Sequence, residues 1–135
     1  MHAIAGPFAY LPASLPRGFI FINWSWDHPG GVTCPNRITV TFAGASVGQV
    51  VWSSLWSGCI TGDQFPPPAC NARAMRTARI SGRVVRFNQG NYTSEVWTCF
   101  PSPAGTASGK VEVYAEEFGL TPLAAMRLVA LARPA

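Results

Sequence analysis

The chain has 135 residues, of which ten are Lys or Arg and six are Asp or Glu, so that the net charge is +4. Charged residues make up 12% of the chain, against roughly 25% in an ordinary soluble domain. A lone monomer normally covers itself with charges of both signs, so this depletion predicts that neighbouring copies bury much of the surface. The length suits a single domain, 1–135, and no apolar run approaches the roughly 18 residues of a membrane span.

The chain begins with an apolar arm, residues 1–16, that is broken by Pro7, Pro12 and Pro16. No basic region precedes it, so the arm does not resemble a signal peptide. A proline-stiffened arm of this kind suits a contact with a neighbouring subunit. It suits equally well a tail that is tucked against its own domain.

Short runs rich in Val, Ile, Thr, Phe and Trp predict an all-β core over residues 17–116, an antiparallel sandwich or barrel of about six to eight strands. The expected strands are 18–26, 37–43, 49–56, 78–87, 92–100 and 110–115. The first is apolar on both faces at its start, which indicates a buried central strand. The Asn and Gly residues of 88–91 favour a hairpin between the fourth and fifth strands.

The carboxyl end predicts a short helix over 121–132, with Thr121 as the N-cap and Pro122 at the first helical position. Its single charged residue is Arg127. A helix that is apolar nearly all round is usually buried on more than one side, which makes it a candidate subunit contact. The residues that would make this contact are Leu123, Met126, Leu128 and Leu131. The alternative is a helix that plugs one open end of the sandwich.

The cysteines of the chain are Cys34, Cys59, Cys70 and Cys99. They lack the C-x-x-C spacing of zinc sites, so neither a metal nor another cofactor is expected. Cys59 and Cys70 flank a turn-rich loop and can close it with a disulfide, which leaves Cys34 to pair with Cys99. The alternative is a set of free buried thiols in a reducing compartment.

The most basic stretch of the chain contains Arg73, Arg76, Arg79, Arg83 and Arg86. No carboxylate lies between Asp63 and Glu95, so these charges are uncompensated locally. Arginine suits bidentate phosphate contacts, and the stretch is therefore a candidate site for nucleic acid or another polyanion. The geometry is open, because a helical 71–79 and an extended strand would distribute the side chains differently. The alternative is a solvated or ion-paired face.

A second candidate surface consists of Asn23, Trp24, Trp26 and Asp27. Alternation along a strand places the two tryptophans on one side, where they could stack on a sugar while Asn23 and Asp27 bond its hydroxyls. The alternative is a pair of core tryptophans.

Motifs for catalysis are not found. Asp27 and His28 are adjacent in sequence and would point to opposite faces of a strand. The chain contains neither a G-x-S-x-G nucleophile motif nor a glycine pattern for a phosphate-binding turn. The sequence therefore does not predict an enzyme.

Together these features predict a non-enzymatic, self-assembling structural subunit, such as a viral or phage coat or capsid-decorating protein, in a virion or another extracellular setting. Its partners would be copies of itself, and nucleic acid or an acidic protein surface at the arginines, without membrane insertion. One alternative is an exported, disulfide-stapled β-sandwich module that binds a carbohydrate or a protein. Another is a small nucleic-acid-binding domain.

Overall fold

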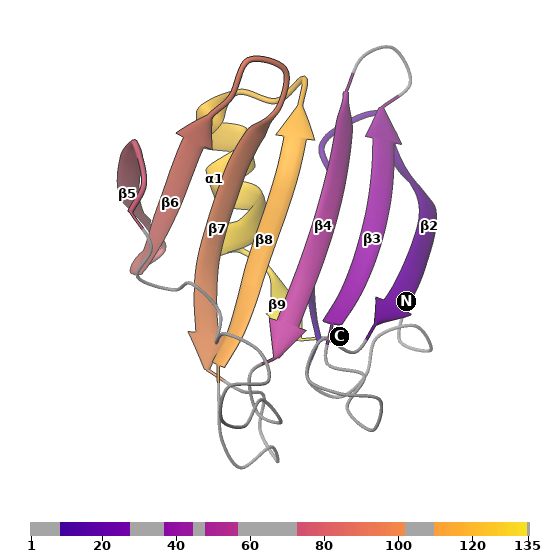
Figure 1. Ribbon diagram of the computed structural model, residues 1–135, viewed down its shortest axis with the longest axis horizontal. Coiled ribbons are helices and arrows are strands. Elements are labelled where there is room, and N and C mark those ends of the chain that lie inside the picture. The colour runs from indigo at the N-terminus through magenta and orange to yellow at the C-terminus, as the bar shows by residue number, and fades with distance from the viewer. Residues whose placement is uncertain (1–8, 28–36, 45–47, 57–72, 102–109, 135) are drawn as a thin grey trace.

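The computed structural model describes residues 9–27, 37–44, 48–56, 73–101 and 110–134. Its strands are β1 (Tyr10–Leu11), β2 (Phe19–Asp27), β3 (Arg37–Gly44), β4 (Gln49–Trp56), β5 (Arg76–Ile80), β6 (Arg83–Gln89), β7 (Ser94–Pro101), β8 (Lys110–Phe118) and β9 (Arg133–Pro134), and its helix is α1 (Pro122–Ala130). Seven strands form one antiparallel sheet in the order β2-β3-β4-β8-β7-β6-β5, while β1 and β9 form a small second sheet. Figure 1 shows α1 behind one face of the large sheet.

This architecture confirms the all-β fold with one short helix near the carboxyl end. The large sheet is open, since β2 and β5 are its two edges and are not paired with each other. Among the described strands, it does not close into a barrel, and no second large sheet faces it. One of its faces is covered by α1, and we call this the helix face; the opposite face, toward the viewer in Figure 1, is the open face.

The core lies on the helix face, where period-two alternation places the apolar residues of each strand. In β3 the buried residues are Ile38, Val40 and Phe42, and the intervening threonines lie on the open face. Helix α1 contacts β5, β6, β7 and β8, and it buries Met126 and Val129 against them. The same alternation pattern that predicted the strands therefore also determines which side chains form the core.

The helix begins and ends close to the predicted limits of 121–132. Thr121 is the N-cap, and its hydroxyl accepts a hydrogen bond from the Ala124 amide at 3.2 Å. The helix ends at Ala130, and the chain then continues into β9, which pairs with β1. In the described part of the chain, no helix is long and apolar enough to cross a bilayer.

The part of the amino-terminal arm that the structure describes is tucked against its own domain. Ala9, Tyr10 and Leu11 are buried in the core. The Trp52 indole N–H donates to the Tyr10 carbonyl at 3.0 Å, and the Tyr10 amide donates to the Ser54 hydroxyl at 3.0 Å. These bonds attach the arm to β4, next to the strands β5 to β8 that α1 mainly contacts. Residues 1–8 lie outside the described residues.

The position of β2 corrects the expectation of a buried central strand. β2 is an edge strand, paired only with β3 among the described strands. Ile20 is 63% exposed, Ile22 is 48% exposed and Trp24 is 42% exposed. The apolar character of this strand on both faces therefore reflects an uncovered edge.

The predicted strand 78–87 is also wrong, because the chain reverses in its middle. Ser81 and Gly82 form a tight turn with φ values of 51° and 77°, and they divide the segment into β5 and β6. Gly82 suits a positive φ because it has no Cβ. The hairpin expected at 88–91 is confirmed, with the Gly90 amide donating to the Thr93 carbonyl at 2.9 Å.

One carboxylate of β8 lies on the helix face. Glu117 is 2% exposed, and its Oε2 accepts a hydrogen bond from the Leu120 amide at 3.2 Å. Burial raises the pKa of Glu117, although the Leu120 amide opposes this shift. Because the folded pKa lies above the unfolded one, the folded state binds more protons, and this residue lowers stability as the pH rises above its unfolded pKa.

We therefore expect Glu117→Gln to raise the melting temperature at pH 8, since the amide oxygen can still accept from Leu120 while the buried charge is gone. The gain should shrink as the pH falls toward the ordinary pKa of glutamate. Thermal melts of the wild type and the variant between pH 4 and pH 8 test this. Glu116→Gln, at the neighbouring exposed position of β8, is the control, and an equal pH dependence in both variants would contradict the assignment.

Candidate functional site

The first candidate site is the exposed edge strand β2. It has nine residues, and between Phe19 and Trp26 it contains no charged residue and no proline. Its register with β3 shifts between Phe21 and Asn23, so Ile22 is the bulged residue. None of the described strands pairs with the outer side of β2, and the backbone N–H and C=O groups of such an edge can form a ladder with another strand.

The opposite edge of the sheet has a different character. β5 has five residues, of which Arg76 and Arg79 are exposed. Short edge strands that carry basic side chains resist pairing with other chains, whereas long apolar ones favour it. The two edges of this sheet therefore differ in their capacity to bind another strand. Sequence reasoning missed this site because it placed β2 in the centre of the sheet.

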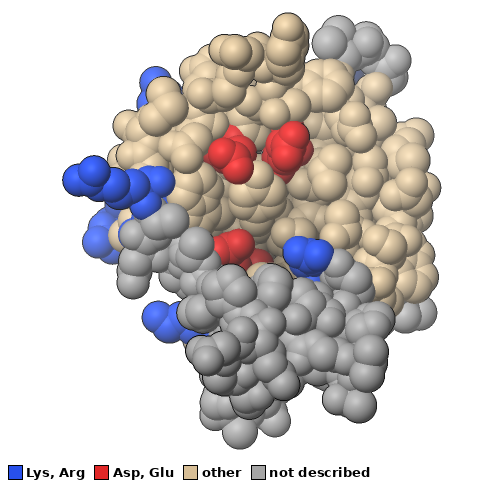
Figure 2. Space-filling model, viewed as in Figure 1, with Lys and Arg blue, Asp and Glu red and all other residues tan. Residues whose placement is uncertain are grey.

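The second candidate site is the open face. Figure 2 shows acidic side chains gathered near its middle, with basic side chains mainly toward the β5 edge. The acidic residues that alternation places on this face are Glu95 of β7 and Glu112 and Glu116 of β8. The middle of this face is therefore acidic, and Arg37 of β3 and Arg86 of β6 lie on the same face.

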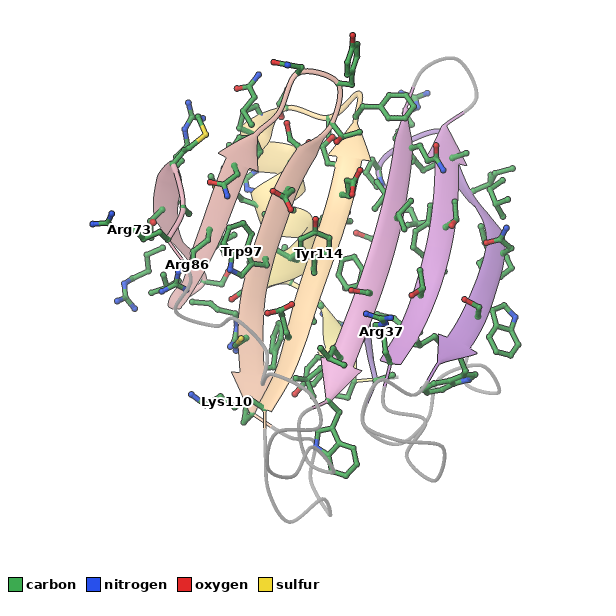
Figure 3. All side chains as sticks on the ribbon, in the orientation of Figure 1. Arg37, Arg73, Arg86, Trp97, Lys110 and Tyr114 are labelled. Atoms are coloured by element: carbon green, nitrogen blue, oxygen red, sulfur yellow. The ribbon has the colours of Figure 1, made fainter. Side chains whose placement is uncertain are left out.

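Tyr114 lies at the centre of this group. Its hydroxyl donates to Glu95 Oε2 at 2.5 Å, and the Thr93 hydroxyl donates to Glu116 Oε1 at 3.2 Å. The pKa of Tyr114 is raised, first by burial and then by the hydrogen bond to Glu95. Tyr114 is therefore neutral at any physiological pH and acts as a hydrogen-bond donor to Glu95. In Figure 3 it lies beside Trp97 of the neighbouring strand, with which it is paired in register.

A groove of about 310 Å³ runs across β3, β4 and β8 on this face. The polar residues that line it are Arg37, Thr39, Ser53, Glu112, Tyr114 and Glu116. They come from three neighbouring strands and are far apart in sequence, so no motif could have indicated them. The described residues hold no group of three or more His, Cys, Asp or Glu that could bind a metal ion.

The five arginines of the basic stretch do not share one face. Register with β6 places Arg76 beside Phe87, on the helix face, and its guanidinium lies 5.7 Å from the centre of that ring. Arg86 is paired with Trp97 on the open face, and Figure 3 shows Arg73 beyond the sheet edge. Residues 76–80 are a strand, so the helical arrangement considered for 71–79 does not hold there. Binding of nucleic acid or another polyanion stays a prediction.

Arg83 has a role within the fold. Its guanidinium lies 3.9 Å from the centre of the Phe100 ring and donates to the Cys99 carbonyl at 2.8 Å. Phe100 in turn stacks on Tyr10, with ring centres 4.3 Å apart. Arg83 therefore stabilises the packing between β6, β7 and the amino-terminal arm.

We expect Arg83→Met to lower the free energy of unfolding by about 2 kcal/mol, because it removes a charged hydrogen bond and a cation–π contact but keeps the aliphatic stem. Arg79→Met is the matched control, since Arg79 is exposed and bonds only the nearby Gly82 carbonyl among the contacts described for it. Urea unfolding of both variants is the measurement. Equal losses in the two variants would contradict a structural role for Arg83.

The aromatic candidates are divided between two faces. Trp24 and Trp26 share one side of β2, as alternation predicted, and because they are opposite the buried residues Val40 and Ile38, this side is the helix face. Trp26 packs against the core, while Trp24 remains partly exposed. Asn23 lies on the open face, opposite Thr41, and the side chain of Asp27 lies outside the described residues. Asn23 therefore does not share a face with the tryptophans.

The proposed subunit contacts on the helix are also divided. Met126 and Leu128 are buried in the protein's own core. The helix lies on the face formed by β5 to β8, so it does not plug the end of a sandwich as the alternative interpretation expected. Leu123 and Leu131 are exposed, at 51% and 47%. These two remain open to a contact with another chain.

Cys99 of β7 is disulfide-bonded. Its partner lies outside the described residues, as do Cys34, Cys59 and Cys70. The pairings of Cys34 with Cys99 and of Cys59 with Cys70 therefore stay predictions.

Comparison of the chain with known protein families, with curated proteins and with solved structures found no match.

Proposed function

We propose that this chain is a non-enzymatic structural subunit that assembles with copies of itself, and that β2 is the edge through which two copies pair. The observation that carries the proposal is the exposed apolar surface of β2, with Ile20, Ile22 and Trp24 uncovered. The first eight residues of this edge, Phe19 to Trp26, are uncharged, so this part can approach an identical edge without repulsion between like charges.

The symmetry of such a contact follows from the identity of the two strands. A twofold axis between two copies of β2 makes the strands antiparallel, and each residue then meets its counterpart reciprocally. The backbone groups on the outer side of β2 would form ladder hydrogen bonds, and the exposed apolar side chains would be buried. The bulge at Ile22 limits the regular part of this ladder to the segments on either side of it.

Assembly beyond a dimer requires a second kind of contact, because a twofold interface closes on itself. The exposed Leu123 and Leu131 of the helix supply an apolar surface for it. A subunit with two such surfaces can build an extended array, of the kind found in a viral or phage coat or in a layer that decorates a capsid. The scarcity of charge in the whole chain agrees with this role, as 16 of 135 residues are charged, the sum of ten basic and six acidic ones.

Light scattering after size exclusion, over a range of protein concentrations, tests the proposal. We expect the wild type to form dimers or larger assemblies. The double variant Ile20→Lys/Ile22→Lys should associate at least about tenfold more weakly, because lysines on an edge strand oppose pairing. Both isoleucines are exposed, so the variant should fold, and a thermal melt checks this.

Met75→Lys is the matched control. Met75 is also apolar and is 75% exposed, but it lies beside β5 at the opposite edge of the sheet. Its substitution should leave association unchanged. A wild type that stays monomeric at every concentration, or an equal loss in both variants, would contradict pairing through β2.

A further inference from the structure

The groove on the open face is lined by residues that take no part in the proposed pairing through β2. Its walls come from β3, β4 and β8, which are neighbours in the middle of the sheet, and it lies on the face opposite to α1. Thr39, Ser53 and Tyr114 are direct register partners across these three strands. Strands lie about 4.8 Å apart, so three hydroxyl-bearing side chains follow one another across the groove at this spacing.

These side chains supply both kinds of hydrogen-bonding group. Threonine and serine hydroxyls can each donate and accept, Arg37 can only donate, and the carboxylates of Glu112 and Glu116 can only accept. A ligand that carries several hydroxyl groups, each of which donates and accepts, matches such a mixture. A purely acidic or purely basic ligand matches only part of it.

The charged groups of the groove already have interactions within the protein. Arg37 and Glu112 each make one in the structure, and Glu116 accepts from the Thr93 hydroxyl. A charged ligand would have to compete with these contacts, because the partners are already engaged. A neutral ligand can add hydrogen bonds to the remaining lone pairs and N–H groups without displacing them.

Apolar surface completes the lining. Val51 and Leu55 of β4 line the same groove, and so does Tyr114. The C–H face of a sugar ring can pack on an aromatic ring such as that of Tyr114, while its hydroxyls bond to the surrounding polar groups; Leu55 contributes little surface, since it is 7% exposed. The volume of about 310 Å³ lies at the lower end of the roughly 300–1,000 Å³ that is usual for small-ligand sites.

We propose that this groove binds a neutral saccharide. The inference is independent of self-assembly through β2, because the groove lies on the open face and contains no residue of the β2 edge.

The test is a titration of the full chain, followed by amide chemical shifts, with four probes: cellotriose, maltotriose, mannotriose and triacetylchitotriose. We expect at least one probe to bind and to shift amides of β3, β4 and β8. Ser53→Ala and Thr39→Val should each weaken that binding by roughly fivefold to tenfold, since each removes one hydroxyl. Thr41→Val is the matched control, because Thr41 lies on the same strand and face as Thr39 but outside the groove, and it should leave the affinity unchanged.

A fifth probe, spermidine, separates a saccharide site from a cation site. The variant Glu116→Gln keeps an acceptor oxygen but removes a charge. It should bind the saccharide with an affinity within about twofold of the wild type, whereas it should no longer bind a cation. If none of the saccharides binds, or if spermidine alone binds and Glu116→Gln abolishes it, the proposal is overturned. Equal weakening by Thr39→Val and Thr41→Val would overturn the assignment to this groove.

Discussion

The structure depends on how one short helix and a short amino-terminal segment cover one face of a wide sheet. A helix of nine residues is about 14 Å long and about 10 Å wide, whereas seven strands about 4.8 Å apart span about 29 Å. Helix α1 therefore covers mainly β5 to β8. The amino-terminal arm adds Tyr10 and Leu11 to this cover: the Trp52 indole donates to the Tyr10 carbonyl and so attaches the arm to β4, while the Tyr10 ring stacks on Phe100 of β7. On β2, Phe19 and Trp26 pack against the core, and Trp24 is exposed.

Two functional proposals follow from this unequal cover. At this edge of the sheet, β2 exposes Trp24 on the helix face, Ile20 on the open face and Ile22 at the bulge, and a second copy of the chain can bury them. The middle of the open face does not need to be buried by another chain, since its residues are largely polar. There the strands bring Thr39 and Ser53 together in a groove. The two surfaces use different parts of the sheet, so a copy paired through β2 leaves the groove accessible. An assembled array of subunits would then present many copies of the groove.

Sequence reasoning predicted the strands and the helix because both depend on local patterns. Alternation in β3 and the Thr121–Pro122 pair are examples, and both are confirmed. The order of strands in the sheet depends on pairing between distant segments, and periodicity does not record it, so β2 was placed wrongly. The turn at Ser81–Gly82 had a local signal in its Ser-Gly dipeptide, but alternation on both sides of it favoured a single strand. The groove could not be predicted, because its residues meet only through the register of β3, β4 and β8.

Hydrogen exchange of the β2 backbone amides, measured on the wild-type chain at low and at high protein concentration, tests the central claim most directly. Amides on the outer side of an unpaired edge strand exchange quickly, and they become protected when they donate to a second strand. The account predicts that protection within Phe19–Asp27 rises with concentration while that of β5 at the opposite edge stays constant. Protection of β2 that does not change with concentration would contradict self-assembly through this edge.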